Sequence, residues 1–292
     1  MANDNISNRA DKAKKIRVAT QKAGGDTVKR LERILERAEK QIKNLGATKL
    51  SILQGSLRRF NGHYSRLTNV EVIAYNDEEK ERIIQFNDTL PDMENTIKKV
   101  SILLEDGIKS VNEGTLESIG VFGITETLGA EAKDKNSVRF EGKGLTFAAL
   151  GPQFVFGGIS GAIGNPFRAL LDWFKPKPVQ KKIPERNEDV ENFRSLMTST
   201  GSRAEQMTLL LKNLEELFKP ALKEMIAVTK RRGYDCNNYS NDEEKIVFTA
   251  YKFAEAINCL LNTSLQSDEG KLNDKEFEEA FSNGQALLDT SR

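Results

Sequence analysis

Residues 144–167 form a run of 24 residues without a formal charge, in a chain where 30% of residues are charged. Such a run folds as a membrane-seeking segment, a buried piece of core or an irregular loop. A helix needs about 20 apolar residues to span a bilayer. Here only half of the run is clearly apolar, several residues are glycine, and Pro152 and Pro166 interrupt it. We therefore do not expect a single transmembrane helix.

The run divides into two apolar halves, residues 145–150 and 154–163, with glycine and proline between them. This division predicts a broken hairpin that either dips into a bilayer or covers a core. Gly157 and Gly161 are four positions apart, a spacing that lets helix backbones approach closely in lipid. In a soluble protein the same glycines would permit a tight loop.

The end of the run carries a pattern typical of a membrane interface. Trp173 is the one tryptophan of the chain, and Lys175 and Lys177 follow it; aromatic and basic residues anchor segments at that depth. The alternative is an amphipathic helix over 167–174 that packs its apolar face on the protein itself. The residues predicted to contact a membrane or a partner protein are Leu145, Phe147, Leu150, Phe154, Phe156, Ile159, Ile163, Phe167, Trp173, Lys175 and Lys177.

The rest of the chain is dominated by helical periodicity. Apolar residues recur at spacings of three to five, which indicates amphipathic helices that bury one face. Long periodic helices of this kind pack against each other as a bundle. The predicted helices cover residues 7–45, 50–67, 77–111, 190–230 and 242–263, with a short last helix from 273.

Several residues predict where these helices begin and weaken. Asn76 is a candidate N-cap with Glu79 three positions later, the spacing of a capping box. Asp242 is a candidate N-cap for the helix over 242–263. The expected weak points are Gly24-Gly25, Pro91, Gly201 and Pro220.

The middle of the chain predicts a change of structure. Residues 137–147, "SVRFEGKGLTF", alternate and turn at glycine, which indicates a β-hairpin, and residues 119–125, "IGVFGIT", read as a short strand. The predicted fold is mainly α, an elongated helical bundle with a small β-hairpin and a Gly-rich apolar insertion in its middle. Its predicted parts are N-terminal helices (1–113), the insertion (114–174), a linker (175–189) and C-terminal helices (190–292) that pack on the first ones.

Net charge is +1, but its sign changes along the chain. Residues 1–70 hold 16 Lys and Arg against 6 Asp and Glu, whereas residues 71–143 hold 9 against 16. Residues 144–187 are basic again, with 6 against 2, and the remainder is acidic. A basic front is compatible with nucleic acid or an anionic membrane. We favour ion pairing inside the bundle, because no nucleic-acid motif accompanies the charge.

Catalytic and metal-binding patterns are weak in this sequence. His63 is the one histidine and is flanked by arginines, which oppose a role as a base. Cys236 and Cys259 form neither a disulfide framework nor a metal motif, and Cys259 reads as a small core residue. We expect no enzyme activity and no cofactor.

Residues 267–277 resemble half of a calcium loop, but Leu265 occupies the first ligand position, where a carboxylate is needed. A turn followed by a helix that Asn273 caps, with Glu276 completing a capping box, is the favoured interpretation, and no metal is expected. The N-terminus lacks the apolar run of a secretory signal. We therefore expect a cytoplasmic protein that associates with membranes.

Two resemblances bear on these patterns. The layout of a long bundle with an apolar hairpin between helices resembles α-helical pore-forming toxins of the cytolysin A and haemolysin BL type, and residues 138–167 would be their membrane tongue. Over most of its length the chain also resembles uncharacterised bacterial helical proteins. These share phrases like "LGATKLSILQGSLRRFNGHYSRLTNVE" and "SLQSDEGKLNDKEF". This second resemblance implies a bacterial source and no known activity.

The predicted function is that of a non-enzymatic bacterial protein that engages membranes through residues 138–174; the toxin resemblance implies pore formation. The alternative is a soluble scaffold or protein-interaction module whose apolar segment is buried. Predicted partners are membrane lipid or a protein, including a second copy of the chain. A nucleic-acid partner is not expected.

Overall fold

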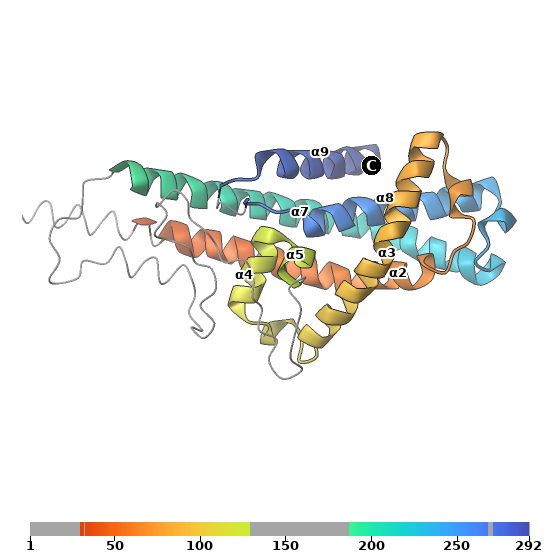
Figure 1. Cartoon of the computed structure of the whole chain (residues 1–292), viewed down its shortest axis with the longest axis horizontal. Coiled ribbons are helices and arrows are strands. Elements are labelled where there is room, and N and C mark those ends of the chain that lie inside the picture. Colours follow the sequence, from red (N-terminus) through yellow and green to blue (C-terminus); the bar gives the residue numbers. More distant parts are fainter. Residues whose placement is uncertain (1–29, 32, 129–186, 268–270, 292) are drawn as a thin grey trace, which may run out of the picture.

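The computed structural model of the chain describes residues 30–31, 33–128, 187–267 and 271–291. These residues form an elongated, mainly α-helical body (Figure 1). No β-strand occurs in the described ranges, where two isolated bridges join Thr68 to Asp235 and Gln266 to Leu272. The prediction of a mainly α-helical bundle is confirmed for this part of the chain. The hairpin predicted over 137–147 lies outside the described residues.

The first long helix covers residues 33–64 without a break. It is α-helical over 33–52, widens to a π-helix at Leu53–Leu57 and continues as α2, Arg58–Tyr64. The other helices are α3 (Asp77–Leu103), α4 (Glu113–Phe122), α5 (Ile124–Leu128), α7 (Asn187–Arg232), α8 (Asn241–Asn262) and α9 (Asp274–Thr290). Short 3₁₀ turns occur at Val70–Ile73, Ile108–Ser110 and Cys236–Asn238.

The long helices lie along the length of the body (Figure 1). α7 runs in the same direction as the helix over 33–64, and α8 turns back along α7. α9 packs on both α7 and α8. α3 crosses the bundle obliquely beside α2. α4 lies against the helix over 33–64 in the middle of the body, and α5 follows it and packs on α3 and α8. Helices from both halves of the sequence therefore share one packed body.

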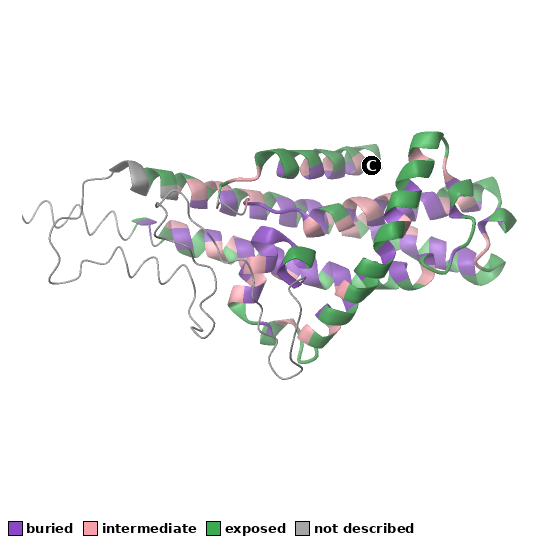
Figure 2. Ribbon diagram, viewed as in Figure 1, coloured by how far each residue is buried: buried purple, intermediate pink, exposed green. Residues whose placement is uncertain are grey.

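The predicted apolar stripes form the core of this body (Figure 2). Each helix buries residues three or four positions apart and leaves its polar face in solvent, as expected of amphipathic helices. The buried residues include Leu35, Ile42 and Leu45 of the first helix, Ile83, Phe86, Met93, Ile97 and Val100 of α3, and Met207, Leu211, Leu214 and Phe218 of α7.

Helix boundaries agree with the sequence in part. The Asn76 side chain accepts a hydrogen bond from the Glu79 N–H at 2.8 Å and caps α3, as predicted. The helix ends at Leu103 rather than near 111, because the chain reverses at Gly107, which has a φ of 87°. The Asp242 prediction is wrong: Ser240 caps α8 and forms a full capping box.

α7 passes through both of the weak points expected in it, Gly201 and Pro220, without a break. Packing explains why residue 201 is a glycine, because a Cβ at this position would lie 3.1 Å from the Ala38 Cα of the first helix. This glycine brings two helices together instead of ending one.

The strand predicted over 119–125 is wrong. These residues belong to α4 and α5, and the chain turns between them at Gly123 with a φ of 89°. The linker predicted over 175–189 also needs correction at its end, because α7 begins at Asn187.

Candidate functional site

All the residues predicted to contact a membrane or partner, from Leu145 to Lys177, lie outside the described part of the chain. The structure instead describes the two points that flank them. The chain leaves the described body after Leu128, at the end of α5, and returns to it at Asn187, the start of α7. We call α4 and α5 together the anchor, because they are the last described elements before that segment.

Backbone contact holds α4 against the first helix. A Cβ added to Gly46 would lie 2.0 Å from the Leu116 carbonyl oxygen, and one added to Gly120 would lie 2.3 Å from the Ile42 carbonyl oxygen. Distances this short leave no room for a side chain at either Gly46 or Gly120. Close approach of this kind permits Cα–H contacts to carbonyl oxygens across the helix interface.

The second half of the anchor is tied to two further elements. The Asn262 side-chain oxygen, at the end of α8, accepts hydrogen bonds from the Thr125 N–H at 3.1 Å and the Thr125 hydroxyl at 2.6 Å. The Lys99 amine of α3 donates to the Leu128 carbonyl at 3.1 Å. This bond satisfies a carbonyl at the C-terminus of α5, where a cation is favoured.

The segment that follows α8 binds the end of α4. The Leu265 N–H donates to the Val121 carbonyl at 2.6 Å, and the Ser264 hydroxyl donates to the same oxygen at 3.2 Å. Ser264, Leu265 and Val121 are all buried. The anchor is therefore fixed to elements on both sides of the undescribed central part of the sequence.

A cluster of three carboxylates around Lys43, of which that of Glu117 is buried, lies at the interface of α4 and the first helix. Glu117 is 1% exposed, and its carboxylate lies 3.3 Å from the Lys43 amine. The same amine pairs with Glu113 at 2.8 Å and with Glu39. Burial, and then the Glu39 charge, raise the pKa of Glu117 to about 7. Burial alone would lower the pKa of Lys43, but its hydrogen bonds to Glu113 and Glu39 hold this pKa above its usual value.

Lys49 lies one turn beyond Gly46 and is fully buried. Its amine donates a hydrogen bond to the Thr263 carbonyl at 3.1 Å. Burial lowers the pKa of Lys49 to about 7, and the Glu276 carboxylate opposes this only in part. A buried amine of this kind is uncharged for part of the time at neutral pH.

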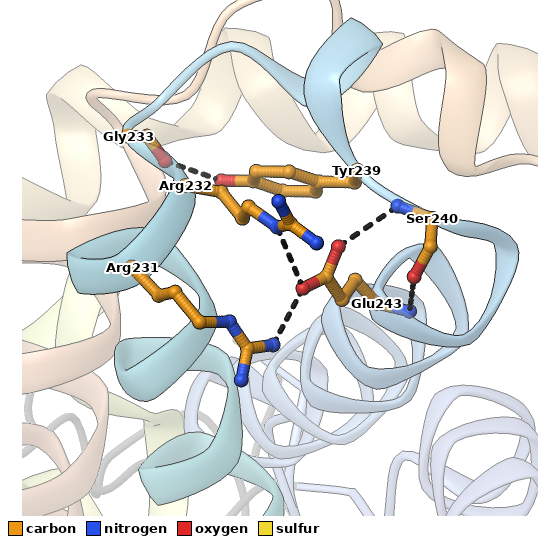
Figure 3. Close-up of polar contacts among 6 residues, drawn as sticks. All are labelled: Arg231, Arg232, Gly233, Tyr239, Ser240 and Glu243. Carbon is orange, nitrogen blue, oxygen red and sulfur yellow. Dashed lines mark hydrogen bonds and ion pairs between the residues drawn. The ribbon is translucent and has the colours of Figure 1, made fainter.

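At one end of the bundle (Figure 1), polar contacts close the turn between α7 and α8 (Figure 3). The Glu243 carboxylate accepts hydrogen bonds from the Ser240 N–H at 2.9 Å and the Arg232 Nε at 3.1 Å, and from Arg231. The Ser240 N–H, followed by the two arginines, lowers the pKa of Glu243 to about 2. The Tyr239 hydroxyl donates to the Gly233 carbonyl at 2.8 Å. These groups form hydrogen bonds with one another, so we assign them a role in holding the turn.

The chemical candidates from the sequence have ordinary surroundings. His63 is half-buried with its Nδ1 3.4 Å from the Tyr234 hydroxyl, and burial followed by Lys230 and nearby arginines lowers its pKa. Cys236 is buried, whereas Cys259 is exposed, so the prediction that Cys259 fills the core is wrong. No group of three or more His, Cys, Asp or Glu among the described residues is arranged to hold a metal ion.

The segment after α8 also differs from its prediction in detail. α9 begins at Asp274, as the predicted helix from 273 requires, but Asn273 makes no side-chain capping bond. Its amide donates instead to the Glu276 carboxylate, which also accepts the Ser264 N–H at 3.2 Å. The predicted capping box is therefore wrong, because Glu276 is directed to the chain that leaves α8.

The fold and these contacts define a mainly α-helical bundle protein. None of its described helices combines the length and the apolar content needed to cross a bilayer. Searches among models of known protein families, curated proteins and solved structures found no match to this chain. The resemblances to pore-forming toxins and to bacterial helical proteins thus remain predictions.

Proposed function

We propose that this protein is non-enzymatic and engages lipid membranes through residues 138–174, in the part of the chain between Leu128 and Asn187 of the helical body. The observation that carries the proposal is the anchor. The chain leaves the body through α5, whose last carbonyl, that of Leu128, is bound by Lys99, and it returns as the 46-residue helix α7. An apolar segment tied at both ends is presented to lipid without separating from the bundle.

The sequence of the held segment supports a lipid partner. Residues 144–167 carry no charge, so their insertion transfers no ion into hydrocarbon. Six basic residues against two acidic ones over 144–187 favour an anionic surface, by about 1 kcal/mol for each basic residue near it. Trp173, Lys175 and Lys177 are of the types that anchor a segment at the interface.

Trp173 gives a direct test, because it is the one tryptophan of the chain and lies next to the apolar run. Vesicles of phosphatidylcholine with 30% phosphatidylglycerol are titrated into the full-length protein, and tryptophan emission is recorded. We expect a blue shift, together with quenching by lipids brominated on their acyl chains. An unchanged spectrum at saturating lipid would contradict the proposal.

Co-sedimentation with the same vesicles identifies the residues that bind. Phe154→Asp and Ile159→Asp place charges in the apolar halves and should leave the protein in the supernatant. Leu209→Asp is the matched control, because Leu209 is 62% exposed on α7 and far along the sequence from the segment. Equal loss for all three variants would show that binding does not depend on the segment.

Two finer functions are separated by the same vesicles. Pore formation, which the toxin resemblance implies, predicts release of an entrapped dye at lipid concentrations where Trp173 emission shifts. The alternative function is a soluble scaffold with the segment buried on the protein or on a partner. It predicts that neither emission nor sedimentation responds to lipid.

A further inference from the structure

A pocket of about 330 Å³ lies between the end of α2, the loop that follows it and the middle of α3. Tyr64 and Leu67 line it on one side, and Asn87, Leu90 and Pro91 line it on the other. Its volume falls at the lower end of the range of about 300–1,000 Å³ that small-ligand sites occupy. The pocket is partly open to solvent and belongs to none of the contacts described above.

Two polar atoms of the pocket residues lack partners. The Tyr64 side chain is 1% exposed, and its hydroxyl has no hydrogen-bond partner among the described residues. The side-chain oxygen of Asn87 is likewise buried and without a partner in that part of the chain. Buried polar atoms in folded proteins nearly always have a partner in the protein, in water or in a ligand. These two atoms therefore point to a missing polar group.

The backbone of α3 adds a third acceptor at the same place. Pro91 lies inside the helix and has no N–H, so the carbonyl of Asn87, four residues earlier, lacks its usual helical partner. Glu94 lies two turns beyond Asn87 on the pocket wall, paired at the surface with Lys98 at 2.8 Å. The unpartnered oxygens of Tyr64 and Asn87 can all accept a hydrogen bond, so they favour a ligand that donates one.

The loop on the opposite side is held in place before any ligand arrives. Asn69 adopts a left-handed conformation with a φ of 57°, which is uncommon for a residue with a side chain. Its amide donates to the Asp235 carboxylate at 2.9 Å. The Thr68 N–H donates to the Tyr234 carbonyl at 2.8 Å, and its carbonyl accepts the Cys236 N–H at 3.1 Å. Fixed walls of this kind are typical of ligand sites, which are largely pre-formed.

We propose that this pocket binds a small organic amine. Its ammonium or N–H groups donate to the Tyr64 hydroxyl and the Asn87 oxygens and face the Glu94 carboxylate. Its apolar part contacts Leu67, Leu90 and Pro91. The site is separate from membrane engagement, so either activity is open to test without the other.

Benzylamine is the probe, with benzyl alcohol and benzoate as controls of the same shape. Binding to the full-length protein is measured by saturation-transfer difference NMR and by titration of amide chemical shifts. We expect benzylamine to bind with a Kd on the order of 1 mM and each control to bind at least about tenfold more weakly. Shifted amides should map to α2, the following loop and α3.

Four variants locate the site. Tyr64→Phe removes a hydroxyl that has no described partner, so the fold is retained while benzylamine binding weakens about fivefold, the value of one hydrogen bond. Glu94→Gln should reduce the preference for benzylamine over benzyl alcohol. Their controls are Tyr251→Phe, whose hydroxyl donates to a carboxylate at 2.9 Å, and Glu78→Gln, from a similar ion pair on α3; neither control should change binding.

Three results overturn the proposal. The first is that benzylamine fails to bind at 10 mM, which leaves water as the occupant of the pocket. The second is equal binding of the amine and the alcohol. The third is that Tyr64→Phe and Glu94→Gln bind like the wild type while circular dichroism shows that both are folded.

Discussion

Replacing Lys49 with methionine should stabilise the protein at neutral pH. Methionine has nearly the length and volume of lysine but no charge, and the site is fully buried. Because the pKa of Lys49 is about 7 in the folded protein, against 10.5 for an ordinary lysine, the fold binds this proton less tightly than the unfolded chain does. A buried ion replaced by an apolar side chain of similar size is often stabilising.

The magnitude follows from the pKa difference. Each pKa unit corresponds to about 1.4 kcal/mol, so folding with Lys49 costs roughly 4 kcal/mol at pH 7. Methionine leaves the Thr263 carbonyl without its 3.1 Å hydrogen bond, which costs about 1 kcal/mol or slightly more. The net stabilisation by Lys49→Met is about 2–3 kcal/mol. In a chain of this size that raises the Tm by roughly 5 °C.

The pH dependence gives a sharper test than the Tm. The unfolded chain binds more protons than the fold between pH 7 and 10.5, so the wild type gains stability as pH rises through this window. At pH 9 the cost of Lys49 has fallen to roughly 2 kcal/mol, and below pH 7 it stays at its maximum. Urea unfolding of the two proteins at pH 6, 7 and 9 should therefore show the advantage of Lys49→Met shrinking as pH rises.

Lys99→Met is the matched control, because the Lys99 amine also donates to a main-chain carbonyl at 3.1 Å but is exposed. The free energy of unfolding of Lys99→Met should be lower than that of the wild type by about 1 kcal/mol or less, and it should not exceed the wild-type value at low pH. If Lys49→Met destabilised the protein at every pH, or if its advantage did not change between pH 6 and 9, the reasoning from a buried, weakly basic amine would be refuted.

Three further substitutions, with Gly62→Ala of α2 as a control, test the anchor and the turn between α7 and α8. Glu117→Gln should stabilise by about 1–2 kcal/mol above pH 7 and have no effect near pH 4.5, because the raised pKa of Glu117 makes its charged form costly in the fold; urea unfolding across that range measures this. Gly120→Ala should destabilise the protein by about 2–4 kcal/mol, since its Cβ would lie 2.3 Å from the Ile42 carbonyl oxygen. Gly62→Ala, whose Cβ would have nothing within 4 Å, should stabilise it by about 1 kcal/mol. Thermal unfolding measures both effects. Ser240→Ala removes the capping box of α8 and should cost about 1 kcal/mol, detectable as a lower urea midpoint with an unchanged m-value.

The sequence predicted the long helices well because their signal is local. Ile83, Phe86 and Met93 recur at helical spacing, and all of them are buried in α3 as expected. Asn76 was identifiable as an N-cap because capping depends on residues three positions apart. Features of this kind depend on a short stretch of chain and not on its partners.

The anchor could not be predicted in the same way. Residues 119–125 read as a short strand, but they belong to α4 and α5, and Gly120 is needed because α4 approaches the Ile42 carbonyl, which is remote in sequence. Lys49 carried a usable signal, because it continues the apolar stripe of Ile42 and Leu45 at helical spacing. Its burial still depended on the chain after α8, which no local pattern places.

The length of α7 determines how far apart its two ends lie in the body. Its 46 residues extend over roughly 70 Å, at 1.5 Å of rise for each residue. Charges in physiological salt are screened within about 8 Å. The Glu243 turn at one end therefore receives no electrostatic influence from whatever Asn187 adjoins at the other. Under the proposed function α7 would act as a spacer, and a fluorophore at the turn would measure its height above the lipid surface.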